Sequence, residues 1–369
     1  MQSFIPPKRI LLGAGPSNVS QRVLDALARP TIGHLDPEFL RMMDEVKELL
    51  KYAFQTKNEM TLVVPGPGSS AMEMCFVNLV ERGDTVVVCV NGVFGARMKE
   101  NIERCGGTAI VVEDEWGKPI DINKVREALE NNSEAKILAW VDAETSTGVR
   151  SDTRSLVRLA HDHGCLTIVD GVPVLGGQEF YVDDWNIDVA YGGSQKCLSC
   201  VPGLAPITFG KRAVEVIQMR KTKVQSWLLD LNQIMNYWGG KTKRTYHHTA
   251  PVNSLYAMHE ALLILREQGL ENSWKRHKEL ADILQKKLES IGFSFFVEEP
   301  YRLPQLSVVT IPEGVDDLGI RKKLLDEYNI EIGAGLGPMA GKIWRIGLMG
   351  HSGSEENIDK LVAAFKNIL

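Results

Sequence analysis

The sequence predicts an α/β fold with a mainly parallel, doubly wound sheet in a large domain, followed by a smaller C-terminal α+β domain. Two observations support this prediction. Short apolar runs alternate with segments of helical periodicity between residues 60 and 191, as in chains whose parallel strands are joined by helices. After about Pro251 the pattern changes to long helical segments and then to short mixed elements.

The expected strands are the runs rich in β-branched and aliphatic residues. They cover residues 60–64, 85–90, 108–112, 136–141, 166–169 and 189–191. Helices are expected between them over residues 71–80, 96–105, 120–129 and 155–163. In the C-terminal part, long helices are expected over 253–268 and 272–290, because Gly269 between them is a typical helix stop. The smaller domain then uses residues 293–298, 306–311, 320–327 and 343–348 and ends in a helix over 355–368.

Length and spacing also predict the domain limits. A chain of 369 residues exceeds the size at which one hydrophobic core usually suffices. We expect an N-terminal arm over residues 1–15, a large domain over 16–252 and a small domain over 253–369.

Composition narrows the class of protein. Hydrophobic residues make up 44% of the chain and charged residues 24%, and the net charge is −5. This balance gives no electrostatic support to nucleic-acid binding. No apolar run reaches the roughly 20 residues that span a bilayer. The first residues do not resemble a secretory signal, and the last three do not match a peroxisomal signal. We therefore expect neither a nucleic-acid nor a membrane partner, and a cytoplasmic location.

The six cysteines are expected to be reduced thiols. Cys197 and Cys200 form one CxxC pair, but no second pair and no histidine at zinc-finger spacing accompanies them. Packing in the core explains these two cysteines better than metal binding or a redox function does, and no metal site is predicted.

The most informative pair of residues is Asp170 and Lys196. Each lies at the end of an apolar run, where a charged side chain is costly unless it has a partner or a chemical role. Taken singly, Asp170 can be a turn acid and Lys196 a loop lysine. Taken together, they match what pyridoxal 5′-phosphate (PLP) requires: an acid for the ring nitrogen and an amine that forms a Schiff base. Burial would also lower the pKa of the lysine and make it nucleophilic.

Two strand-to-helix turns could complete such a site. Gly66 to Ser70 reads GPGSS, and free N–H groups at a helix start bind phosphate, although an ordinary capped turn has the same sequence. Phe94 in NGVFG could stack on a cofactor ring or fill the core. The N-terminal LLGAGPSN imitates a dinucleotide fingerprint but lacks its third glycine, so an NAD site is disfavoured.

Arg345 and the segment at 246–249 carry further polar candidates. Arg345 lies inside an apolar run, and its planar guanidinium suits a substrate carboxylate or an internal ion pair. Tyr246 and Thr249 flank two histidines, and their hydroxyls could serve a phosphate.

In these residues the chain resembles the class V, fold-type I PLP-dependent aminotransferases, and within them the alanine–glyoxylate and serine–pyruvate (serine–glyoxylate) aminotransferases. The resemblance covers nearly the whole chain. Its motifs are LLGAGPSNV, IGHLDPEF, FQTKN, PGPGSSAMEM, NGVFGAR, ETSTGV, IVDGV, GGSQKCL, YHHTAP, SLYAMHEAL, EQGLENSWKRH and GKIWRIGLMG.

The resemblance implies a role for each candidate. Lys196 would carry PLP as a Schiff base, and Asp170 would pair with the ring nitrogen. Val172 and Phe94 would cover the two ring faces, and Thr145 would contact the cofactor near its phenolic oxygen. The phosphate would be bound by Gly68, Ser69 and Gln195. Tyr246 and Thr249 would reach the phosphate of the partner subunit, which implies a homodimer with shared active sites. Arg345 would bind the substrate carboxylate.

The implied reaction is a ping-pong transfer of the amino group of alanine or serine to glyoxylate or pyruvate. Pro67 departs from the family, because relatives often carry Ser or Thr there and one phosphate donor is lost. The similar (S)-ureidoglycine–glyoxylate aminotransferases carry Gln where this chain has His34 and Asn where it has Tyr246. That enzyme is the alternative, together with a class V lyase or desulfurase, although no cysteine lies in the predicted small domain to act in desulfuration.

Overall fold

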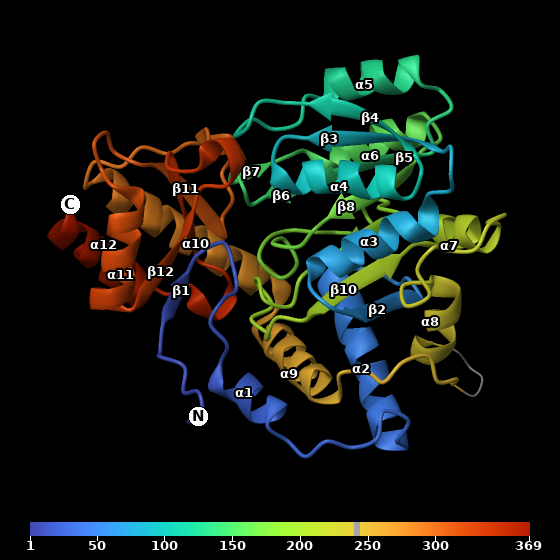
Figure 1. Cartoon of the computed structure of the whole chain (residues 1–369), viewed down its shortest axis with the longest axis horizontal. Helices are drawn as coiled ribbons and strands as arrows, with labels where there is room; N and C mark the ends of the chain where they lie inside the picture. Colours follow the sequence, from blue (N-terminus) through green and yellow to red (C-terminus); the bar gives the residue numbers. More distant parts are fainter. Residues whose placement is uncertain (240–243) are drawn as a thin grey trace.

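The computed structural model describes residues 1–239 and 244–369 (Figure 1). Its main feature is a seven-stranded sheet in the order β2-β10-β9-β8-β5-β3-β4. The strands are β2 (Met60–Pro65), β3 (Thr85–Val90), β4 (Thr108–Glu113), β5 (Ile137–Val141), β8 (Leu166–Asp170), β9 (Val189–Tyr191) and β10 (Leu204–Phe209). All neighbours pair in parallel except β10, which is antiparallel to both β2 and β9. The predicted mainly parallel α/β fold is confirmed.

Helices follow the strands as the alternating sequence predicts. They are α3 (Gly68–Leu79), α4 (Val93–Arg104), α5 (Ile122–Asn131) and α6 (Thr153–Asp162). In Figure 1, α3 and α4 lie in front of the sheet, and they pack against each other, as α5 and α6 do. Every residue of the central strands β5 and β8 is buried. This burial explains their mainly apolar sequences, since strands covered on both faces do not alternate. Thr167 and Asp170 of β8 are the polar exceptions.

Several elements were not among those predicted. Strand β10 contains Pro206, and a proline usually argues against a central strand because it cannot donate to the ladder. The sequence also did not indicate the strands β1 (Ile10–Leu12) and β12 (Ile330–Ala334), described below. Nor did it indicate two shorter strands and four helices. These are β6 (Ala143–Glu144), β7 (Val149–Arg150), α1 (Gln21–Leu27), α2 (Pro37–Phe54), α7 (Lys211–Gln218) and α8 (Leu231–Trp238).

A second sheet of four strands has the order β1-β12-β13-β11. It consists of β1 (Ile10–Leu12), β11 (Leu306–Thr310), β12 (Ile330–Ala334) and β13 (Ile343–Gly347), accompanied by α10 (Leu270–Glu289), α11 (Asp317–Tyr328) and α12 (Glu355–Ile368). The expected element at 293–298 is not a strand. It makes one bridge, from Phe295 to Val309, and then enters a 3₁₀ helix, Glu299–Tyr301, whose proline cannot extend a ladder.

The described residues form two clusters of buried hydrophobic side chains. The larger surrounds the seven-stranded sheet and includes residues of α9 (Val252–Gln268), which packs on α1 and α2. The smaller lies against the second sheet and includes Leu12 from β1, so the N-terminal arm contributes a strand to the C-terminal sheet. The domain limits at residues 15 and 252 stay a prediction. Within the described ranges, no helix is both long and apolar enough to cross a membrane.

Replacing Phe365 by Ala should destabilise the smaller core. Phe365 is fully buried, and its ring lies 5.5 Å from Trp344 and 5.0 Å from Phe293. Truncation leaves a cavity, so we expect the free energy of unfolding to fall by about 3–5 kcal/mol. Urea denaturation followed by fluorescence measures this change. As a control, Leu318→Ala on α11, where the side chain is 65% exposed, should cost less than about 0.5 kcal/mol. Equal effects of the two substitutions on the free energy of unfolding would contradict the assignment of Phe365 to a tightly packed core.

Candidate active site

A cavity of about 260 Å³ lies where β5 and β8 end and α3 and α4 begin. Parallel sheets commonly bind ligands at this edge, because the connecting loops leave a crevice beyond the strand ends. The cavity is lined by Pro67, Gly68, Ser69, Met72, Phe94, Arg97, Val141, Ala143, Thr145, Asp170, Val172, Pro173, Gln195 and Lys196. Most of the sequence candidates are therefore together in one small space.

Lys196 reaches the cavity from the loop after β9. Its Nζ donates a hydrogen bond to the carbonyl oxygen of Ala14 in the N-terminal segment. Gly15 permits this approach, since a Cβ on that residue would lie 2.6 Å from Nζ. Burial, with a smaller contribution from the positive charge of Arg345, lowers the pKa of Lys196 to about 8. About a tenth of this amine is therefore neutral at pH 7, and the neutral form is the nucleophile.

Asp170 is the last residue of β8 and is 2% exposed. Its Oδ1 accepts from the backbone N–H of Val172 at 2.9 Å, and its Oδ2 accepts from the Tyr191 hydroxyl at 2.9 Å. Burial outweighs these two hydrogen bonds and raises the pKa of Asp170 to about 7. The carboxyl is thus poised to ionise when a cationic group is placed beside it. Such a group is what a protonated pyridine nitrogen would provide.

Tyr191 was not a sequence candidate. It lies on β9 directly beside Asp170 in the parallel ladder, and it is fully buried. Only the strand register places its hydroxyl on the carboxylate, so a pattern of apolar residues could not reveal it.

The start of α3 fits a phosphate group. Pro67 is the N-cap residue and makes no side-chain cap hydrogen bond, so the first N–H groups of the helix have no capping side chain. A Cβ on Gly68 would lie 2.8 Å from the Val172 side chain, so only glycine fits this approach. Gln195 also lines the cavity. Its Oε1 atom is an acceptor that is buried without a hydrogen-bond partner in the described structure, so only its amide N–H groups could donate to a phosphate. These polar groups line the cavity and are available to a ligand.

Glu144 fixes the start of α4 and was also missed. It is fully buried, and its Oε2 accepts from the N–H groups of Phe94 and Gly95 at 3.0 and 3.3 Å. Its Oε1 accepts from both the N–H and the hydroxyl of Ser146. Burial raises the pKa of this carboxyl. Glu144 therefore holds Phe94 in the cavity wall, next to the aspartate and lysine.

Arg345 on β13 approaches the cavity from the second sheet. Its Nε donates to the carbonyl oxygen of Ala334 at 2.7 Å, and its Nη1 donates to that of Thr145 at 3.1 Å. Burial lowers the pKa of Arg345, which is 9% exposed, and it forms no ion pair with a described carboxylate. Thr145 itself lines the cavity, so the guanidinium lies directly behind the cavity wall.

Tyr246 and Thr249 do not line this cavity. The Tyr246 side chain is 60% exposed, and its hydroxyl lies 3.4 Å from the Thr249 hydroxyl. The ring of His34 lies 5.1 Å from that of Tyr246. The structure therefore separates these two residues from the lysine of their own chain.

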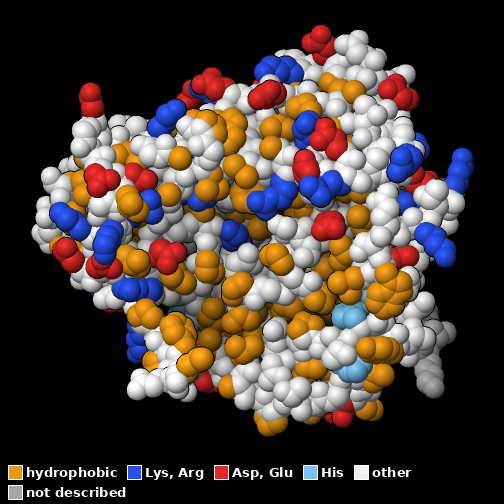
Figure 2. Space-filling view, in the orientation of Figure 1, with side chains coloured by type: hydrophobic (Ala, Val, Ile, Leu, Met, Phe, Trp, Pro, Cys, Tyr) orange, Lys and Arg blue, Asp and Glu red, His pale blue; other side chains and the backbone are white. Residues whose placement is uncertain are grey.

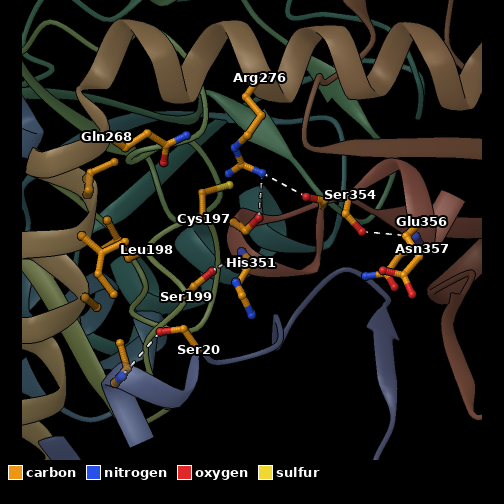
Figure 3. Close-up of a pocket in the computed structure, with 16 residues that line it drawn as sticks. Ser20, Cys197, Leu198, Ser199, Gln268, Arg276, His351, Ser354, Glu356 and Asn357 are labelled. Carbon is orange, nitrogen blue, oxygen red and sulfur yellow. Dashed lines mark hydrogen bonds between the residues drawn. The ribbon is translucent and has the colours of Figure 1, made fainter. Parts of the chain in front are cut away.

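A larger cavity of about 470 Å³ lies on the other side of the lysine loop (Figure 3). Arg276 projects into it from α10, and its Nη1 donates to the carbonyl oxygens of Gly350 and Gly353. The N–H of His351 donates to the Ser199 hydroxyl at 2.6 Å. The contact between His351 and Ser199 ties the lysine loop to the segment after β13, and Arg276 binds that same segment. The thiols of Cys197 and Cys200 are free and buried, and burial raises the pKa of each to about 12.

Comparison with known proteins supplies independent information. The family model for class V aminotransferases matches residues 9–361. Alanine–glyoxylate aminotransferase of Rattus norvegicus is 42% identical over 98% of this chain and 88% of the rat protein. The (S)-ureidoglycine–glyoxylate transaminase of Bacillus subtilis is 34% identical over 98% of this chain and 91% of its own length. The crystal structure of alanine–glyoxylate aminotransferase from Nostoc sp. superposes with a TM-score of 0.97 at 45% identity, covering 100% of this chain and 97% of that one.

The lowered pKa of Lys196 predicts how its reactivity depends on pH. Because burial disfavours the ammonium form, the proton leaves near pH 8 rather than near the ordinary lysine value of 10.5. We expect the rate constant for reaction of the ligand-free chain with pyridoxal phosphate to rise about tenfold per pH unit below 8 and then level off. Stopped-flow absorbance measures this rate. The rate of N-acetyl-lysine amide in the same buffers, expressed per neutral amine, corrects for titration of the aldehyde. A corrected rate that still rises up to pH 10 would contradict the lowered pKa.

Proposed function

We propose that this chain, which belongs to the class V aminotransferase family and therefore to the PLP-dependent enzymes, transfers the amino group of alanine or serine to glyoxylate or pyruvate. The observation that carries this proposal is the pairing of Lys196 with Asp170 in one 260 Å³ cavity that also contains the phosphate-binding turn. The names of the rat and Nostoc relatives support glyoxylate as the acceptor and alanine as a donor.

The residues divide the work between them. PLP, when bound, supplies an electron sink for the electron pair left on the substrate Cα. We assign Asp170 to the ring nitrogen, because a carboxylate beside that atom favours its protonated form. Val172 and Phe94 would cover the ring faces, and Thr145 would contact its phenolic oxygen. Gly68, Ser69 and Gln195 would bind the phosphate.

Lys196 would then act as the general base. With a pKa of about 8, its amine can take a proton from the substrate Cα and return it. Arg345 would hold the substrate carboxylate, since its guanidinium is next to the cavity and has no carboxylate partner among the described residues.

His34 and Tyr246 favour alanine or serine over ureidoglycine as the donor. These are two positions at which this chain departs from the residues that resemblance assigns to the ureidoglycine enzymes, and their rings lie 5.1 Å from each other. Their contact supports a joint role in recognising the substrate.

A homodimer with shared active sites is part of the proposal. Tyr246 and Thr249 do not line the cavity of their own chain, so we infer that they reach the phosphate in a partner subunit. Figure 2 shows hydrophobic side chains gathered over the region of α1 and α9. Exposed hydrophobic residues of the neighbouring segments are Leu24, Ile32, Leu35, Trp227 and Leu228. Burial of such a surface would stabilise a dimer.

We further propose a cytoplasmic location.

Replacing Lys196 by Ala tests the assignment of the reaction. We expect the substituted chain to lose the visible absorbance of the PLP-loaded protein, because no other amine lines the cavity among the described residues. The wild-type protein, loaded with PLP and mixed with alanine but no acceptor, should lose that absorbance and release one equivalent of pyruvate. A panel of alanine, serine, glycine and ureidoglycine with glyoxylate and pyruvate then ranks the substrates. An unchanged spectrum for Lys196→Ala, or no pyruvate from the wild type, would refute the proposal.

Mixing two inactive variants tests the shared site. In a dimer of one Lys196→Ala chain and one Tyr246→Ala chain, one site lacks both side chains and the other keeps both. Co-refolding equal amounts should therefore restore about a quarter of wild-type activity, since about half of the dimers are mixed and each has one complete site. Activity is compared with that of each variant refolded alone. Activity no higher than the mean of the two variants would show that Tyr246 serves its own subunit.

A further inference from the structure

We propose that Arg97 on α4 is an additional phosphate-binding residue, which acts on a phosphate monoester dianion directly and through the hydroxyl of Ser69. This inference rests on the proposed function, because the dianion in question is that of the cofactor. Arg97 was not among the residues indicated by the sequence or by the family resemblance.

The geometry of the Arg97 contact is suited to this role. Its Nη1 donates a hydrogen bond to the Ser69 Oγ at 2.8 Å. The hydroxyl is then an acceptor toward Arg97, so its own proton is free to be donated to another group. Both side chains line the cavity together with Gln195 and Lys196. Arg97 therefore orients the serine proton at the start of α3, where the phosphate is expected.

The charge of Arg97 is also available. The other cations of α4 are paired one turn away, Lys99 with Glu103 and Arg104 with Glu100. Arg97 forms no such pair within the described part of the chain, and its guanidinium instead lies 5.0 Å from the centre of the Phe94 ring. A cation that faces a cavity and stacks on an aromatic ring is well placed to bind an oxyanion.

Pro67 supplies a reason for this arrangement. It is the N-cap residue of α3 and has no side-chain donor, whereas Ser or Thr at that position would offer a hydroxyl. Arg97 compensates by adding a charged donor that contacts Ser69 at the same helix start. A planar guanidinium also binds phosphate oxygens through two parallel N–H groups, which a serine hydroxyl cannot do.

The test compares PLP with pyridoxal, which lacks the phosphate, as ligands of the purified ligand-free chain. Dissociation constants are measured by absorbance titration. We expect Arg97→Met to weaken PLP about ten- to a hundredfold, as expected for loss of a charge-assisted contact, and to leave the affinity for pyridoxal unchanged. Arg97→Lys should lose less affinity for PLP than Arg97→Met, because lysine keeps the positive charge but not the planar guanidinium. Arg104→Met on the same helix is the matched control and should change neither affinity.

The outcomes separate the alternatives. Equal weakening of PLP and pyridoxal would overturn the proposal in favour of a structural role through Phe94. An unchanged affinity for PLP with a raised KM for alanine would overturn it in favour of a substrate-carboxylate role. If Arg97→Met does not fold, Arg97→Lys decides, since the proposal requires a loss confined to PLP. A wild-type chain that binds neither aldehyde would instead refute the proposed function.

Discussion

The structure depends on the burial of two ionisable groups of opposite kind at one edge of a parallel sheet. Desolvation penalises the charged form of each, so it raises the pKa of Asp170 to about 7 and lowers that of Lys196 to about 8. The pKa values of the two groups therefore lie close to each other. In this pH range a small change in the nearby charge can protonate or deprotonate either group. A bound cation beside Asp170 would restore its negative charge without any rearrangement of the protein. The same site on the surface would have an ionised acid and a protonated amine.

Maintaining this burial requires several remote segments to meet. Ala14 and Gly15 cover the lysine amine, and the Ser17 hydroxyl donates to the carbonyl oxygen of Lys196 at 2.8 Å. The same N-terminal segment begins in β1, a strand of the second sheet. On the far side, His277 accepts from the N–H of Gly350 at 3.0 Å, and burial lowers its pKa to about 4, so it stays neutral and can accept. The N-terminal segment therefore contacts the lysine loop through Ser17 and pairs with the second sheet through β1, so both ends of this segment are fixed.

The sequence predicts what depends on local pattern and fails where lateral contacts decide. Strand β3 is predicted residue for residue, and Asp170 and Lys196 stand out because charges at the ends of apolar runs are conspicuous. Tyr191 and Glu144 do not stand out, although both are fully buried beside the cavity. Tyr191 acts through the register of β9 against β8, and Glu144 through the turn that faces α4. Strand β10 was not predicted for the opposite reason. Pro206 is a local signal against a strand, but pairing with β2 and β9 overrides it.

The segment from Glu144 to Ser146 links the two ends of the candidate site. Glu144 holds the backbone of Phe94, which lies in the wall proposed for the cofactor ring. The next residue, Thr145, uses its carbonyl oxygen to accept from Arg345, which we assign to the substrate carboxylate. The negative charge of Glu144 also favours the charged form of Arg345 and the protonated form of Asp170. One short segment therefore contacts both Phe94 and Arg345, and in the proposed site it would set the spacing between the cofactor ring and the substrate carboxylate.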